Sequence, residues 1–79
     1  MKTKKQQLLE LFERDDIVGI KVLVKIPECP EVETIYNPKA NFEYKKVYYA
    51  YAYDDNLRLN AVKDIEIVNF VGVGGVIDE

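Results

Sequence analysis

The sequence contains no histidine, no serine and no tryptophan, and its only cysteine is Cys29. Without these side chains, no serine or cysteine nucleophile can be paired with a histidine base within this chain, which argues against most hydrolase mechanisms. Zinc sites built from histidine or from paired cysteines are excluded in the same way. We therefore expect a protein that is not an enzyme and that holds no metal and no cofactor.

Cysteine usage and apolar runs also bear on location. A single cysteine cannot form an internal disulfide, which favours a reducing compartment. The basic start MKTKK is followed by QQLLELFERDD, which lacks the apolar run of a signal peptide. The longest apolar stretch, FVGVGGVI, is far shorter than a membrane span. We expect a cytoplasmic protein without a membrane partner.

Acidic residues outnumber basic ones by 14 to 11, giving a formal net charge of −3. Nucleic-acid binding draws on clustered lysine and arginine, so this balance argues against a nucleic acid as the main partner. A local basic patch of Lys39, Lys45 and Lys46 stands against that background. The share of hydrophobic residues, 48%, indicates a folded globular chain, and 79 residues suit one domain over 1–79.

Residues 3–14 are predicted to form a short amphipathic helix. Thr3 and Gln6 fit a capping box, in which each side chain satisfies a free backbone N–H. The positions at helical spacing on its apolar stripe are Leu8, Leu11 and Phe12. Because so short a helix does not persist alone in water, the stripe must pack on something. It either covers the sheet that follows or contacts the same helix in a second copy.

Residues 17–71 are predicted to form a strongly bent antiparallel sheet of four to five strands. In the first strand, residues 17–26, the apolar residues alternate with lysines. The face they form consists of Val18, Ile20, Val22, Val24 and Ile26. Pro27 ends this strand, and residues 27–41 are expected to form a long loop, broken at most by a short strand at VETIY. The remaining predictions are strands over 43–53, 57–62 and 64–71 and a flexible tail over 72–79.

The stretch VYYAYAYDDN, residues 47–56, holds four of the six tyrosines. As a strand, it places Tyr49, Tyr51 and Tyr53 on one face. A three-residue turn at 54–56, with Asn56 in the left-handed region, pairs Tyr53 with Leu57 and directs this row into the core. A two-residue turn at 55–56 would direct the same row away from the leucines. We favour the first arrangement, in which the tyrosines are mainly structural.

The opposite side of that strand, with Ala50 and Ala52, admits close approach of another element, and the apolar stripe of the N-terminal helix is its expected cover. In the alternative interpretation Tyr44, Lys46 and Tyr48 on that side form an exposed contact patch. Aromatic rings beside a cation suit contact with a peptide or with single-stranded nucleic acid. The candidate binding residues are Tyr36, Lys39, Tyr44, Lys46 and Tyr48. The candidate residues for contact between copies are Leu8, Leu11 and Phe12.

Two resemblances add to this interpretation. The run VYYAYAYDDNLRLNAVKDIEIVNF resembles the second half of an SH3-like small β-barrel, with a tight acidic turn and a brief turn at VKD before the last strand. This resemblance implies a partly open barrel over 17–71, to which the N-terminal helix is added. The stretch 37–60 also resembles short proteins carried by temperate phages and prophages of Gram-positive bacteria, which implies a small accessory or host-interaction protein.

The leading hypothesis for function is a non-catalytic protein-interaction module acting through the 27–41 loop and the edge near residues 44–48. One alternative is a nucleic-acid-binding barrel that uses Tyr44, Tyr48 and the three lysines of the basic patch. The other is a structural homo-oligomer joined through the helical stripe.

Overall fold

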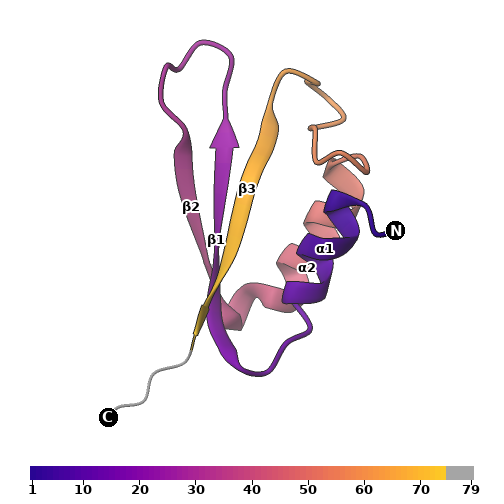
Figure 1. Cartoon of the computed structure of the whole chain (residues 1–79), viewed down its shortest axis with the longest axis vertical. Coiled ribbons are helices and arrows are strands. Elements are labelled where there is room, and N and C mark those ends of the chain that lie inside the picture. Colours follow the sequence, from indigo (N-terminus) through magenta and orange to yellow (C-terminus); the bar gives the residue numbers. More distant parts are fainter. Residues whose placement is uncertain (75–79) are drawn as a thin grey trace.

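The computed structural model describes residues 1–74 and places two helices on one face of a three-stranded sheet (Figure 1). The sheet is antiparallel with strand order β2-β1-β3, so β1 is the central strand. The fold is α+β and the sheet is open. In chain order the elements are α1 (Lys4–Leu11), β1 (Ile17–Lys25), β2 (Glu33–Pro38), the 3-10 turn η1 (Lys39–Asn41), α2 (Phe42–Ala52) and β3 (Glu66–Gly74).

The predicted sheet of four to five strands and the SH3-like barrel are wrong. Residues 43–53, predicted as a strand, fall almost wholly within helix α2. Residues 57–62 contribute only isolated bridges, which pair Tyr53 with Leu59 and Arg58 with Glu66. Tyrosine favours strands, but that preference is weak and depends on context, and here tertiary packing outweighs it. A short strand does occur where VETIY had suggested one, because β2 covers most of that segment.

Helix α1 begins with the predicted capping box. The Thr3 hydroxyl accepts from the backbone N–H of Gln6 at 3.1 Å, and the Gln6 side chain accepts from the backbone N–H of Thr3 at 2.9 Å. The helix is shorter than predicted, because it ends at Leu11. Leu8 is fully buried and Phe12 is nearly so, which fixes α1 against the rest of the core.

Strand β1 departs from the predicted alternation at its start. Its pairing with β3 shifts between Ile17 and Gly19, which are opposite Gly74 and Val73, so β1 holds one extra residue there. Such a bulge reverses the phase of side-chain alternation. As a result Ile17 is buried and Val18 is exposed, whereas Ile20, Val22 and Val24 face the core as predicted.

The loop after α2 also differs from the predicted three-residue turn. Tyr53 pairs with Leu59 rather than with Leu57, and the residue with positive φ is Leu57, at 63°, not Asn56. The Asp54 carboxylate accepts hydrogen bonds from the backbone N–H groups of Asn56 and Arg58, each at 2.9 Å. These two bonds stabilise this conformation of the loop. Leu57 is fully buried, and burial of its side chain offsets the strain of a left-handed leucine.

Strand β3 continues to Gly74, into the segment 72–79 that was predicted as a tail. The remainder of that segment lies outside the described residues.

A candidate interaction surface on helix α2

Helix α2 presents apolar and aromatic residues on two opposite sides. The inward side carries Phe42 and Tyr49, which are 6% and 2% exposed. On the outward side, residues at positions i, i+3, i+4 and i+7 share one face, since the helix has about 3.6 residues per turn. We call this face the α2 stripe; its residues are Tyr44, Val47, Tyr48 and Tyr51, with exposed fractions of 70%, 54%, 39% and 79%.

An aromatic cluster fixes the inward side of α2. The Phe12 ring meets the Phe42 ring edge-on, with centroids 5.1 Å apart, and lies 5.7 Å from the Tyr49 ring. Tyr49 in turn lies 5.6 Å from Tyr53, which follows the last helical residue. Aromatic pairs at these separations attract beyond the burial of their area. Because the cluster determines which side of α2 faces the core, it also determines that the α2 stripe faces solvent.

A buried hydrogen bond ties α2 to β2. The side-chain amide of Asn37 donates to the Tyr49 hydroxyl at 3.2 Å, and Asn37 is 1% exposed. Burial raises the pKa of Tyr49, and burial with the neighbouring Tyr48 and Tyr49 raises the pKa of Tyr53 to about 12. An ordinary tyrosine is already protonated at neutral pH, and these shifts extend the protonated range of both buried hydroxyls to higher pH.

A lysine organises part of the exposed stripe. The ammonium nitrogen of Lys45 lies 5.8 Å from the centre of the Tyr44 ring and 5.1 Å from that of Tyr48. A cation within about 6 Å of an aromatic ring is attracted to its face. Lys45 therefore links two rings of the stripe and places a positive charge along its flank.

Of the five predicted binding residues, the structure brings only Tyr44 and Tyr48 together. Lys46 lies on the side of α2 that faces α1, where it pairs with Glu13. Lys39 lies in η1 and donates to the main-chain oxygen of Asp15 at 3.2 Å. Val47 and Tyr51 were not predicted from the sequence as part of this surface. The signal that could have identified them is their helical spacing relative to Tyr44 and Tyr48.

The fifth predicted residue, Tyr36, lies on the face of the sheet that carries no helix. It pairs with Lys21, whose neighbours Ile20 and Val22 point into the core. The Tyr36 ring packs on Gly19, where an added Cβ would collide with it, and its hydroxyl lies 3.4 Å from the main-chain oxygen of Val18. Tyr36 is thus remote from the α2 stripe and partly engaged within the sheet.

The predicted contact residues between copies belong to the core of the monomer. Leu8 and Phe12 are buried, and Leu11 packs against the same cluster. From the sequence, the apolar stripe of the N-terminal helix was expected either to pack within its own chain or to contact a second copy. In the structure these three residues pack within their own chain.

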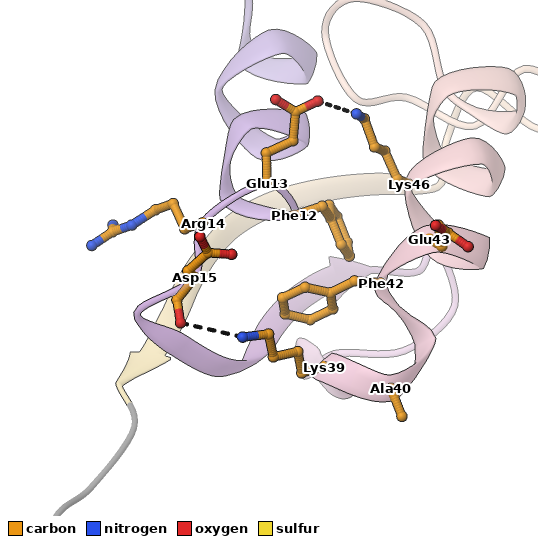
Figure 2. A pocket seen from close by; sticks show the side chains of 9 residues that line it. All are labelled: Phe12, Glu13, Arg14, Asp15, Lys39, Ala40, Phe42, Glu43 and Lys46. Atoms are coloured by element: carbon orange, nitrogen blue, oxygen red, sulfur yellow. Dashed lines mark hydrogen bonds and ion pairs between the residues drawn. The ribbon is translucent and has the colours of Figure 1, made fainter.

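A charged hollow of about 400 Å³ opens between the end of α1 and the start of α2 (Figure 2). The rings of Phe12 and Phe42 lie between the two segments, and the pairs Glu13–Lys46 and Asp15–Lys39 span it. The Glu13 carboxylate and the Lys46 ammonium are thus engaged with each other, and the Lys39 ammonium is engaged with the main-chain oxygen of Asp15. Within residues 1–74 no cluster of three or more side chains has the arrangement of a metal site.

Neither helix of the described chain is long and apolar enough to cross a bilayer. Comparison with models of protein families, with curated proteins and with solved structures found no match. The resemblance to phage and prophage proteins stays a prediction.

Proposed function

We propose that this chain is a small, non-catalytic protein-interaction module that binds its partner through the α2 stripe. The observation that carries the proposal is the exposure of three tyrosines and a valine at helical spacing on one side of α2. Tyrosine is enriched at protein interfaces and among the residues that contribute most to binding energy. The sequence had suggested the 27–41 loop together with the edge near residues 44–48; the proposal keeps the second of these, which lies in α2, and leaves out the loop.

The shape and charge of the stripe favour one kind of partner. A straight ridge at positions i, i+3, i+4 and i+7 fits the apolar side of another helix, in the way that helices pack ridges into grooves. Lys45 supplies a positive flank beside Tyr44 and Tyr48. We therefore expect a partner helix with apolar residues at its centre and a carboxylate that faces Lys45.

A matched pair of substitutions tests this proposal. Val47→Lys places a charge at the centre of the stripe, and Val71→Lys makes the same change at a residue of similar exposure on strand β3. The chain, immobilised as bait, is exposed to nuclease-treated lysate, and the captured proteins are identified by mass spectrometry. We expect proteins that Val71→Lys retains and Val47→Lys loses. Capture that both variants retain equally would exclude the stripe as the binding surface.

The same experiment without nuclease tests the nucleic-acid alternative. If the captured material is nucleic acid, and if the amount bound falls steeply as the salt concentration rises, the partner is a nucleic acid and not the proposed protein. We expect the captured proteins to remain bound across moderate salt, because contact through tyrosine and valine is mainly apolar.

A further inference from the structure

Strand β2 leaves one of its backbone edges open. It is the outermost strand in the order β2-β1-β3, and Figure 1 shows no element beyond it. In the part of the chain that the structure describes, no backbone hydrogen bond outside the β1–β2 ladder involves residues 33–37, and Pro38 leads into η1. Within residues 1–74, alternate N–H and C=O groups of β2 therefore point outward without a protein partner.

This edge lacks the devices that usually prevent strand addition. β2 pairs with β1 through six successive residues without a bulge, and it contains no lysine or arginine. Its only proline, Pro38, is the last residue of the strand. By contrast, β3 is irregular in its pairing with β1, and its first residue, Glu66, is bridged by Arg58 on the other side. A regular edge whose one charged residue, Glu33, stands at its end is open to another strand.

Apolar side chains are exposed on both faces of the same edge. Ile35 pairs with buried Val22 and so points to the helix side, yet 41% of it is exposed. Tyr36 points to the opposite side with 47% exposed, and Val32, just before the strand, has 43% exposed. An added strand would cover part of this surface as well as the open backbone groups.

We propose that β2 pairs antiparallel with β2 of a second copy of this chain, which joins the two sheets into one of six strands. The register sets Ile35 opposite Ile35 of the second copy, at the two-fold axis. It also sets Thr34 opposite Tyr36 of the second copy, a β-branched residue against an aromatic one, which is a favourable cross-strand pair. The helices of both copies then lie on the same face of the joined sheet.

Charge complementarity identifies the occupant as a second copy. Continued past the ends of β2, this register sets Glu31, in the bend two residues before the strand, against Lys39 of the second copy, the first residue of η1, and two-fold symmetry makes the contact twice. The Lys39 ammonium donates to the main-chain oxygen of Asp15 in its own chain, and with three donors it can also meet Glu31 of the second copy. Glu33 lies opposite uncharged Asn37. A parallel arrangement would instead set Glu31 and Glu33 against the same acids of the other copy, which is unfavourable.

Charge reversal tests the pairing directly. Glu31 and Lys39 are both exposed, and Lys39→Glu removes within its own chain only the exposed contact to the main-chain oxygen of Asp15. Glu31→Lys and Lys39→Glu should therefore leave the fold intact, which far-UV circular dichroism checks. Sedimentation velocity of the unaltered chain over rising concentration should show dimer. Each single variant should dimerise about tenfold more weakly, because each turns two attractive pairs into two repulsive ones.

Restoring opposite charges at the two contacts gives a sharper test. A mixture of the two single variants, and also the double variant alone, restores opposite charges at both contacts. Both should recover the dimer. An unaltered chain that stays monomeric at every concentration would overturn the proposal, as would single variants that dimerise as well as the unaltered chain.

Amide hydrogen exchange of the unaltered chain provides a second measurement that does not depend on any variant. Alternate amides of residues 33–37 should gain protection as the concentration rises and lose it on dilution. A dimer in which these amides exchange freely would contradict the proposal. Val47→Lys should leave the dimer unchanged, so a result here is independent of the function proposed for the α2 stripe.

Discussion

The ammonium group of Lys5, in the first turn of α1, donates to the main-chain oxygen of Ala50 in the last turn of α2 at 3.2 Å. It also donates to the main-chain oxygen of Tyr53 at 3.1 Å. A cation at the carboxyl end of a helix complements the helix dipole and satisfies carbonyls that lack intrahelical partners. A lysine in the first turn of α1 opposes the dipole of its own helix, and its position is explained by the helix that it caps.

Loss of this contact should weaken the fold. We expect Lys5→Met to lower the free energy of unfolding by about 1 kcal/mol, because it removes a charge-assisted cap at the end of α2. Lys4→Met is the matched control, since Lys4 is exposed and should change stability by less than about 0.5 kcal/mol. Urea unfolding followed by circular dichroism compares the two. Equal effects would show that the Lys5 contact adds nothing to stability.

The buried pair of Asn37 and Tyr49 gives a second prediction. Tyr49→Phe removes the hydroxyl that accepts from the Asn37 amide, which leaves a buried donor unpaired and should cost roughly 1–3 kcal/mol. Tyr51→Phe removes a hydroxyl from a side chain that is 79% exposed and should be nearly neutral. Chemical denaturation measures both variants. The prediction fails if Tyr49→Phe is as stable as Tyr51→Phe.

Asp54 should make stability depend on acid pH. Hydrogen bonds from the backbone N–H of Arg58 and from the Lys63 ammonium, the latter at 2.9 Å, lower the pKa of Asp54 to about 2 from 3.8. Because the folded-state pKa lies below the unfolded one, this contribution is complete above about pH 4 and is lost as the pH falls through 2.

The matched substitutions are Asp54→Asn and Asp55→Asn. Thermal unfolding from pH 6 down to pH 2 should show that Asp54→Asn loses less stability than the unaltered chain. Asp55→Asn should follow the unaltered chain, because Asp55 is exposed and its nearest cation, Lys5, is 3.8 Å away. Parallel curves for the unaltered chain and Asp54→Asn would contradict the role given to Asp54.

Features decided by neighbouring residues could be predicted from the sequence. The capping box of Thr3 and Gln6 depends on residues within one helical turn, and the apolar face of β1 depends on alternation along a single strand. The bulge that exposes Val18 could not be predicted, because it arises from the pairing of β1 with β3, far along the chain.

Helix α2 was missed for a different reason. Tyr49, Tyr51 and Tyr53 alternate as strand residues do, while Tyr49 and Tyr53 are also one helical turn apart. The two periods coincide over this short stretch, and local propensity favours the strand. The deciding contacts come from elsewhere in the chain: Phe12 packs on the inward side of α2, Asn37 bonds to Tyr49, and Lys5 caps the helix.

The central claim is that α2 is a helix that turns Tyr49 and Tyr53 inward and the α2 stripe outward. Chemical modification of the tyrosines in the native chain, read residue by residue with mass spectrometry, tests it most directly. We expect Tyr44 and Tyr51 to react readily and Tyr49 and Tyr53 to be protected, in line with exposed fractions of 70%, 79%, 2% and 6%. If Tyr49, Tyr51 and Tyr53 react together, or are protected together, the segment is a strand and the α2 stripe does not exist.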